Sequence, residues 1–515
     1  MFDLLIRNGT ICDGTGAPAF RGDVGVRGDT IADIGDLTGA EARKTVDASG
    51  QIVAPGFIDA HTHSDAFILV EPFSPSKLTQ GVTTEVCGMC GGSAAPKLDG
   101  ALMPSDWEAQ TYARSWTTVA EYRKVFEAAH PAVNVLMYAG HNTLRKGVTG
   151  NAPRAATAEE TAEMCRRLEQ ALDEGAWGLS TGLIYHPGVH SRPEEVLALA
   201  RTAAAKGGYY ATHMRSEGDR LLEAVDEVLA LGRATGIPLQ LSHLKTSGKA
   251  NWCKIDALLE KIESARAEGL AVHADRYPYL AAGTDLDIVL PDWAQAGGRD
   301  AILANLADPA RRSRIESELN ASDRDWNEVM IGGTWSSVSR PFQGRRIGEV
   351  TDNPGALVAA VIEADGTRTG AFFFGMCEEN LRRILDCPWV MPGSDASLRS
   401  PEGPLAADYP HPRAYGTMPR FYRMLREKHS AETAIARMTG LPAKSLGIPR
   451  RGFLQKGLFA DIITLSPDRF RDVADYADPR RFSEGVELVC VNGGIVYESG
   501  AFVGSGKGRF LTREK

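Results

Sequence analysis

The sequence predicts an α/β protein with three parts: a (β/α)8 barrel of the TIM type, a small β-sandwich domain built from both ends of the chain, and an insertion after the seventh barrel strand. Three patterns predict this fold class. Strand-like and helix-like segments alternate through the middle of the chain, both ends are rich in short strands and turn residues, and the alternation is interrupted once. The length of 515 residues suits a barrel with an accessory domain.

The two ends of the chain share one character. Residues 1–55 contain stretches such as LLIRNGTICDGTG and GDVGVRGDTIADIG, in which Gly, Asp and Asn separate short apolar runs. Within residues 446–515, the stretches KGLFADIITLSP and ELVCVNGGIVYESGAF look similar. Isolated short hairpins are only marginally stable in water. We therefore expect residues 1–55 and 446–515 to form one small β-sandwich domain rather than two separate flaps.

Residues 56–445 alternate between apolar strand-like pieces and helical patterns. The strand-like pieces are, in order, GFIDAHTH, GVTTEVCGM, VNVLMYAGH, GAWGLSTGL, GGYYATHM, IPLQLSHLK, LAVHADRYPY and PWVMPGSDA. Helical patterns such as AEETAEMCRRLEQALDEG and GDRLLEAVDEVLALGRATG lie between them. These eight strand-helix units predict a parallel sheet that closes into a (β/α)8 barrel.

One segment, at about residues 285–345, interrupts this rhythm after RYPYLAAGT. It contains the helix-like stretch GGRDAILANLADPARRSRIESELN, and the alternation resumes near TRTGAFFFGM. Long excursions beyond a barrel strand are often functional. We expect this insertion to lie where it can cover the mouth of the barrel.

The composition excludes several classes of partner. The formal net charge is −9 and the pI is near 5.8, which argues against nucleic acid or an anionic membrane as the main partner. No apolar run approaches the length of a membrane span, and the N-terminal residues do not resemble a signal peptide. Eight scattered cysteines suit reduced thiols rather than a disulfide scaffold. We expect a cytoplasmic monomer or small homo-oligomer that acts on a small molecule.

Two histidines end the first predicted strand. His61 and His63 stand in the stretch FIDAHTHSDAF, one residue apart. Residues i and i+2 of a strand point to the same face, so both imidazoles project together. In (β/α)8 barrels the chemistry takes place at the C-terminal ends of the strands.

Other metal-binding side chains follow the other predicted strands. They are Cys90 after the second strand, His213 after the fifth, His243 after the sixth and Asp395 after the eighth. Taken alone, such a histidine is usually a satisfied polar residue, and such a cysteine usually packs in the core. Their joint occurrence on one rim predicts a metal site. Imidazole, thiolate and carboxylate are zinc ligands, and the soft thiolate favours zinc over magnesium or manganese. The spacing leaves open whether one or two metals bind.

At these residues the sequence resembles the amidohydrolase superfamily, and within it the N-acyl-D-amino acid deacylases (D-aminoacylases). The matching stretches are PGFIDAHTHSD, QGVTTEVCGMCGGSAAP, GLSTGLIYHPG, THMRSEGD, SHLK, YPY, PGSDA and HPRAYGTMPR, with LLIRNGTICDGTG and GLFADIITL in the predicted small domain. Two positions depart from the family pattern: GMCG replaces the common GNCG at Met89, and Cys87 stands where a non-thiol residue is usual. We expect Cys87 to pack in the core.

The resemblance implies zinc-dependent hydrolysis of the amide bond of N-acyl-D-amino acids, which yields a D-amino acid and a carboxylate. It implies a tight zinc position formed by Cys90, His213 and His243. It also implies a second, weaker position formed by His61, His63 and Asp395. Asp395 would be the catalytic acid and base, because a carboxylate beside an activated water can accept its proton and pass it to the leaving nitrogen.

The resemblance also implies a site for the carboxylate of the substrate, formed by Lys245, Tyr277 and Arg413. Arginine offers a bidentate fork, lysine a point charge and tyrosine a hydroxyl donor. Tyr185, near the end of a predicted strand, is a further pocket candidate. YPYLAAGT is one residue longer than a common family form, which leaves open whether Gly283 or Thr284 faces the substrate.

Three other functional classes are weaker alternatives. Cyclic-amide hydrolases of the dihydroorotase or hydantoinase type usually place a carboxylated lysine at the end of strand four. This chain has GLSTGL there, and Cys90 is its candidate metal ligand instead of the lysine. A deaminase is a third possible relative, but these residues give no reason to expect a nucleobase as the substrate. A non-catalytic barrel relative would normally have lost its ligands, whereas all six predicted metal-binding residues are present.

Overall fold

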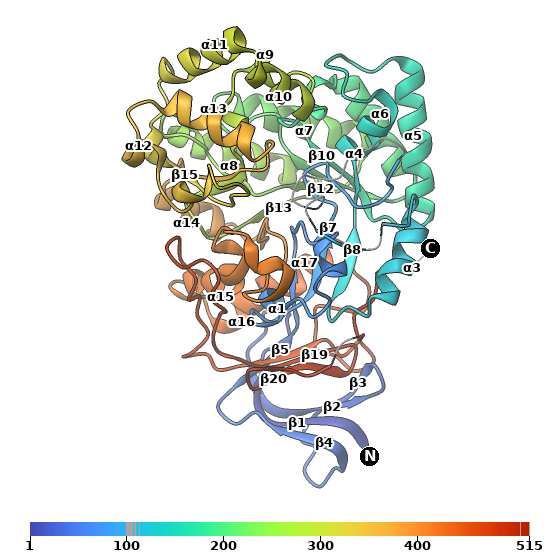
Figure 1. The fold of residues 1–515 in the computed structure, drawn as a ribbon. Helices are drawn as coiled ribbons and strands as arrows, with labels where there is room; N and C mark the ends of the chain where they lie inside the picture. The colour runs from blue at the N-terminus through green and yellow to red at the C-terminus, as the bar shows by residue number, and fades with distance from the viewer. Residues whose placement is uncertain (99–106, 108–109, 113, 505, 514–515) are drawn as a thin grey trace.

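Strands from both ends of the chain form the small β domain at the bottom of Figure 1, below a larger α/β part. The computed structural model describes residues 1–98, 107, 110–112, 114–504 and 506–513. Within these residues the β domain holds one sheet of nine strands. They are β1 (Phe2–Ile11), β2 (Phe20–Arg27), β3 (Thr30–Gly35), β4 (Ala42–Asp47), β5 (Ile52–Pro55), β18 (Ile462–Leu465), β19 (Val486–Val491), β20 (Gly494–Glu498) and β21 (Ala501–Phe502).

The antiparallel pair β5–β18 joins the two ends of the chain. Ala54 lies opposite Ile463, and all four residues of each strand are buried. Side chains from both ends, such as Ile6, Val24 and Leu488, pack in one hydrophobic cluster. Neither end could bury these apolar faces alone.

The predicted (β/α)8 barrel is confirmed. In the described chain its strands are β6 (Phe57–Asp59), β7 (Val82–Cys87), β8 (Asn134–Met137) with β9 (Ala139–Gly140), β10 (Gly178–Gly182), β11 (Tyr209–His213), β12 (Leu239–Leu241), β13 (Val272–Arg276) and β17 (Val390–Pro392). Tyr138 alone separates β8 from β9, so these two pieces form the third strand. A parallel bridge between Thr62 and Ala396 closes the ring between the first and last strands.

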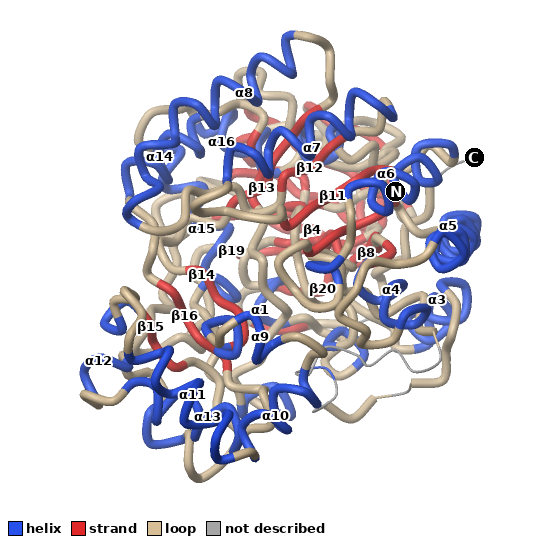
Figure 2. The backbone as a smooth tube through the Cα atoms, turned by 90° about the horizontal axis from the view of Figure 1, so that it is seen from above, coloured by secondary structure: helices blue, strands red, loops and turns tan. Residues whose placement is uncertain are grey.

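Helices surround these strands, as Figure 2 shows from above. They are α1 (Pro75–Leu78), α3 (Val119–Ala128), α4 (His141–Thr149), α5 (Ala158–Asp173), α6 (Pro193–Ala205), α7 (Leu221–Thr235), α8 (Ile255–Ala267), α14 (Glu378–Asp386), α15 (Arg413–Arg426), α16 (Ala431–Met438) and α17 (Gly440–Ser445). Local signals set their ends: a capping box between Thr157 and Glu160 begins α5, and left-handed Gly236 ends α7. None of the helices in the described residues is long and apolar enough to cross a membrane.

The insertion after the seventh strand is larger than the sequence predicts. It contains β14 (Ala282–Asp285), α9 (Asp292–Gln295), α10 (Arg299–Ala307), α11 (Pro309–Asn320), β15 (Val329–Ile331), α12 (Ile347–Val350), α13 (Pro354–Ala364) and β16 (Gly370–Phe373). Strand β16 pairs with both β14 and β15, so the stretch TRTGAFFFGM belongs to the insertion and not to a barrel unit. An apolar run has the same appearance in either sheet, and only tertiary pairing separates them.

A fully buried lysine ties three barrel segments together beneath the C-terminal rim. Lys77 Nζ donates to Asp59 Oδ2 at 2.8 Å and to Ser394 Oγ at 3.0 Å, and Glu85 Oε2 lies 3.4 Å away. The Asp59 carboxylate also accepts the backbone N–H of Ser394 at 2.8 Å. The ammonium of Lys77 therefore holds the first, second and eighth strands in register.

Replacing Lys77 with methionine should lower the free energy of unfolding by about 3–5 kcal/mol, because two buried carboxylates lose their cation. Urea denaturation of the full chain measures this change. Lys261→Met is the matched control: Lys261 contacts Asp226 at 2.8 Å in a partly exposed pair, whose loss costs less than about 1 kcal/mol. Equal losses in the two variants would contradict the structural role of Lys77.

Candidate metal centre

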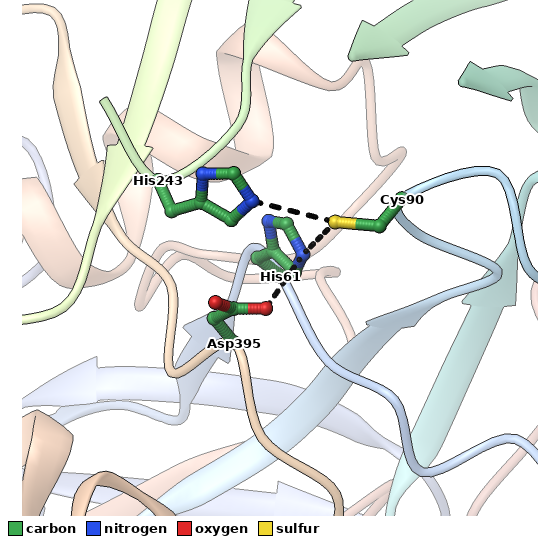
Figure 3. A group of neighbouring side chains, drawn as sticks. All are labelled: His61, Cys90, His243 and Asp395. Carbon is green, nitrogen blue, oxygen red and sulfur yellow. Dashed lines mark hydrogen bonds and ion pairs between the residues drawn. The ribbon is translucent and has the colours of Figure 1, made fainter. Parts of the chain in front are cut away.

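Four side chains from different strands meet at the C-terminal rim of the barrel (Figure 3). Cys90 Sγ lies 3.3 Å from His61 Nε2 and 3.4 Å from His243 Nε2. Asp395 Oδ1 lies 3.3 Å from the same nitrogen of His61. One ligand atom from each of the four residues falls within 4.8 Å of the others, which is close enough to share an ion.

Three of these residues have an uncommon backbone conformation. The φ angles are 51° at Cys90, 37° at His243 and 50° at Asp395. Residues other than glycine rarely adopt the left-handed region, and they do so mainly where the surrounding structure imposes it at functional sites. Each residue follows the end of a barrel strand, where this turn of the backbone aims its side chain at the common point.

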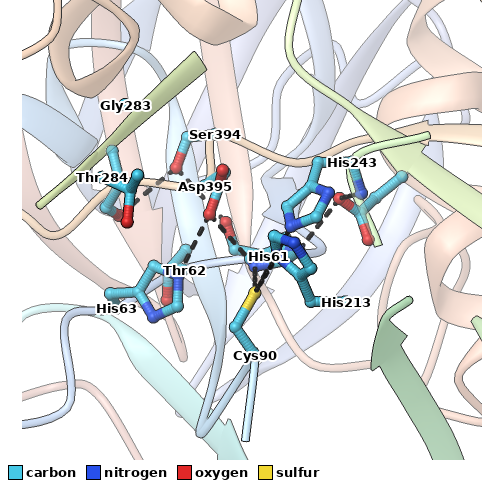
Figure 4. Close-up of polar contacts among 12 residues, drawn as sticks. His61, Thr62, His63, Cys90, His213, His243, Gly283, Thr284, Ser394 and Asp395 are labelled. Atoms are coloured by element: carbon cyan, nitrogen blue, oxygen red, sulfur yellow. Dashed lines mark hydrogen bonds and ion pairs between the residues drawn. The ribbon is translucent and has the colours of Figure 1, made fainter. Parts of the chain in front are cut away.

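The remaining two predicted ligands lie beside this group (Figure 4). His213 Nδ1 lies 3.8 Å from Cys90 Sγ. His63 Nε2 lies 3.0 Å from Asp395 Oδ1. The structure therefore brings together all six residues that the sequence predicts as metal ligands.

Two carboxylates that sequence reasoning did not assign to the site stand behind the histidines. Asp275 Oδ1 contacts His61 Nδ1 at 3.0 Å and accepts the backbone N–H of His243 at 2.8 Å. Glu217 Oε1 lies 2.8 Å from His243 Nδ1. Asp275 was visible as a strand-end residue, and Glu217 stands four residues after His213 in THMRSEGD. Metal-binding histidines usually have such carboxylate partners on their other nitrogen.

The charges favour ionised forms of the sulfur and of the carboxylate. Burial raises the pKa of the Cys90 thiol, but the imidazoles of His61 and His243 outweigh burial and hold that pKa well below its usual value. Burial likewise opposes ionisation of Asp395, yet Arg413 and the same imidazoles hold its pKa well below the usual range. A thiolate, neutral imidazoles and a carboxylate form a donor set that fits zinc.

A cavity of about 500 Å³ opens from this centre toward the insertion. Its wall includes Cys90 and Asp395 from the centre and four of the residues considered for the substrate pocket: Tyr185, Gly283, Thr284 and Arg413. Thr284 Oγ1 lies 3.5 Å from the hydroxyl of Tyr185. Both Gly283 and Thr284 line the cavity.

Lys245 and Tyr277 do not line this cavity. Lys245 Nζ donates to Glu217 Oε1 at 2.5 Å and is almost completely buried. Tyr277 is fully buried, and its ring lies between the guanidinium groups of Arg276 and Arg413, at 4.2 and 4.7 Å from its centre. Tyr277 therefore lies next to Arg413, whereas Lys245 lies against Glu217 and His243.

Gly182, the last residue of strand four, has no room for a lysine side chain. A Cβ atom added to Gly182 would lie 2.1 Å from the carbonyl oxygen of Cys90. The loop that carries Cys90 therefore occupies the space next to this strand end. The two departures from the family pattern, Cys87 and Met89, are fully buried in hydrophobic clusters.

The chain is similar to known proteins along nearly its whole length. The model of the amidohydrolase family matches residues 44–285 and 379–497. The chain is 37% identical over 517 residues to a D-aminoacylase of Alcaligenes xylosoxydans xylosoxydans, covering 99% of this chain and 98% of that protein. It is also 37% identical over 504 residues to an N-acyl-D-glutamate deacylase of the same organism, covering 96% and 93%.

A solved structure resembles the whole fold. It is the N-acyl-D-glutamate deacylase of Bordetella bronchiseptica in complex with zinc and a phosphonate inhibitor that mimics the tetrahedral intermediate of the reaction. The two chains superpose with a TM-score of 0.84 at 34% sequence identity, covering 99% of this chain and 100% of the other.

Protons compete with a metal for the nitrogens of this centre. Burial lowers the pKa of His63, but hydrogen bonds with Asp395 and Cys90 raise it to about 9. Burial also lowers the pKa of His243, yet the carboxylates of Glu217 and Asp395 are among the groups that raise it to about 10. Both imidazoles therefore carry a proton on each ring nitrogen, and a positive charge, at neutral pH in the metal-free chain.

Zinc affinity at the tight position should consequently rise as the pH rises toward about 10, the pKa of His243, because imidazole must lose its proton to bind a metal. Calorimetry in buffers of different ionisation enthalpy counts the protons released when zinc binds. The surface variant His429→Gln should release as many protons as the parent. An affinity that is independent of pH, or that falls as the pH rises, would show that these imidazoles are not ligands.

Proposed function

The chain belongs to the amidohydrolase family, and from this premise we propose that it catalyses zinc-dependent hydrolysis of N-acyl-D-amino acids to a D-amino acid and a carboxylate. The observation that carries the proposal is the convergence of His61, Cys90, His243 and Asp395 on one point, with Cys90 and Asp395 on the wall of the cavity. The preference for the D configuration comes from the similarity to the D-aminoacylase and the N-acyl-D-glutamate deacylase.

Cys90, His213 and His243 would hold the tightly bound zinc ion. His61, His63 and Asp395 would form a second, weaker position beside it. When bound, zinc acts as a Lewis acid that polarises the amide carbonyl and lowers the pKa of water to about 7. Cys90 Sγ lies 3.4 Å from His243 and 3.8 Å from His213, and it lies 3.3 Å from His61, so the sulfur stands next to both proposed positions.

Asp395 is suited to move the proton of the reaction. Its pKa lies well below the usual range, so the carboxylate is ionised at neutral pH and can accept a proton from water. Arg413 Nη1 donates to its Oδ2 at 2.7 Å, which leaves Oδ1 directed toward His61 and His63. The same carboxyl group can then donate the proton to the leaving nitrogen.

Arg413 is the cation best placed for the carboxylate of the substrate. Its Nη2 donates to the carbonyl of Gly283 at 3.1 Å, while Nε has no hydrogen-bond partner among the described residues. Thr284 and Tyr185 add hydroxyl groups to the same wall. Lys245, held by Glu217, would contribute positive potential from outside the cavity, and the ring of Tyr277 would support the guanidinium of Arg413.

A cyclic-amide hydrolase is the second candidate for this fold. The close approach of Gly182 to the Cys90 carbonyl argues against it, because a lysine cannot reach a metal from that position. The cytoplasmic location and the monomeric or small oligomeric state remain predictions, as does a small molecule as the main partner.

Zinc-loaded full-length chain should release free amino acid from N-acetyl-D-amino acids, and much less from the L enantiomers. The assay uses a panel of acidic, aromatic and aliphatic members in both configurations. Removing the metal with a chelator should abolish turnover, and adding zinc should restore it. A complete lack of turnover across the D panel would exclude the proposed activity.

The variant Asp395→Asn should lower kcat by about 10²–10⁴-fold, because an amide cannot shuttle the proton. Zinc at the tight position should remain bound, since its three proposed ligands are intact, and metal analysis of the purified variant checks this. Asp226→Asn, on the outer helix α7, is a control that should leave kcat unchanged. An Asp395 variant with parental kcat would remove this residue from the mechanism.

A further inference from the structure

Glu217 lies on the far side of His213 and His243 from Cys90. It follows β11 in the loop that leads to α7, and its side chain is 13% exposed. Oε1 lies 2.8 Å from His243 Nδ1, and Oε2 lies 3.7 Å from His213 Nε2. We propose that Glu217 is a positioning residue that selects the tautomer of His243 able to bind a metal, an inference that rests on the proposed function.

The tautomer matters because the two ring nitrogens of His243 face different neighbours. Nε2 points to Cys90 Sγ at 3.4 Å, and Nδ1 points to Glu217. A neutral imidazole has one N–H and one lone pair. For Nε2 to offer its lone pair to a metal, the proton must sit on Nδ1. A carboxylate can only accept, so Glu217 favours this tautomer.

Lys245 favours the opposite tautomer. Its ammonium lies 2.8 Å from His243 Nδ1 and can only donate. An ammonium bond to Nδ1 would place the ring proton on Nε2 and block metal binding there. Glu217 removes this competition because Lys245 Nζ donates to its Oε1 at 2.5 Å. The carboxylate thus accepts from both His243 and Lys245.

Another role for Glu217 can be considered, since His213, Glu217 and His243 have the composition of a metal site of their own. The ammonium of Lys245, however, lies against both Glu217 Oε1 and His243 Nδ1. A cation already stands where an ion would have to bind. The geometry therefore favours an orienting role over a third metal position. His213 Nε2 has no hydrogen-bond partner in the described chain, so its ion-pair contact with Glu217 is the weaker of the two.

The test measures the zinc dissociation constant of the full-length chain by competition with a chelator, without substrate. Glu217→Gln should weaken zinc binding by about 10–100-fold, the usual effect of losing such an outer partner. Lys245→Met alone should change zinc binding little. The double variant should bind zinc about tenfold more tightly than Glu217→Gln, because the competing ammonium is gone. A carboxylate that only supported the local fold would show no such recovery.

Glu227→Gln is the matched control. Glu227 lies on α7, pairs with Arg215 at 2.9 Å and touches none of the proposed ligands. It should bind zinc like the parent. Glu217→Asp keeps the charge and should lose less affinity than Glu217→Gln, which gives a second measurement should the latter fold poorly. The proposal is overturned if Glu217→Gln binds zinc like the parent, if the double variant binds no better than Glu217→Gln, or if the aspartate variant is the weaker of the two. Turnover of the D panel by the parent chain tests the proposed function separately.

Discussion

The sulfur of Cys90 lies against ring nitrogens of three histidines, and this contact is the constraint on which the rest of the centre depends. The nitrogens of His61, His213 and His243 stand 3.3, 3.8 and 3.4 Å from it. These groups are buried together, so their charges must compensate one another. Metal ions at the two proposed positions would offset the charges of these groups. The same contact holds the pKa of the thiol well below its usual value, which favours the thiolate that a metal would need.

Holding these groups together requires exact placement of separate barrel segments. Lys77, fully buried beneath the rim, links the strand before His61 to the loop before Asp395 through Asp59 and Ser394. Left-handed backbone at Cys90 and Asp395 then turns their side chains inward. The barrel supplies rigid strand ends, and short loops at these ends orient the candidate ligand side chains. Such division of labour is typical of sites built on (β/α)8 barrels.

A second layer of charges surrounds the ligands. Asp275 and Glu217 hold the outer nitrogens of His61 and His243, while Arg413 holds the outer oxygen of Asp395. Each outer group faces a ligand with the complementary hydrogen-bonding role. The insertion completes the site, because β14 places Gly283 and Thr284 on the cavity wall next to Arg413. The proposed substrate site and the candidate metal centre therefore meet at the ion pair between Arg413 and Asp395.

Local patterns were sufficient to predict the barrel, because eight alternating units allow few other folds. They also placed the six candidate metal ligands on one rim, because zinc donors recurred at predicted strand ends. Features that depend on long-range contacts were harder to predict from the sequence. The extent of the insertion depended on β16 pairing with β14 and β15, which an apolar run cannot reveal. The partner of Lys245 proved to be Glu217, an acidic residue in a polar loop with no pattern of its own. Periodicity reports which face of a segment is buried, whereas the partner of a buried charge depends on how distant segments pack, and only the folded chain defines that.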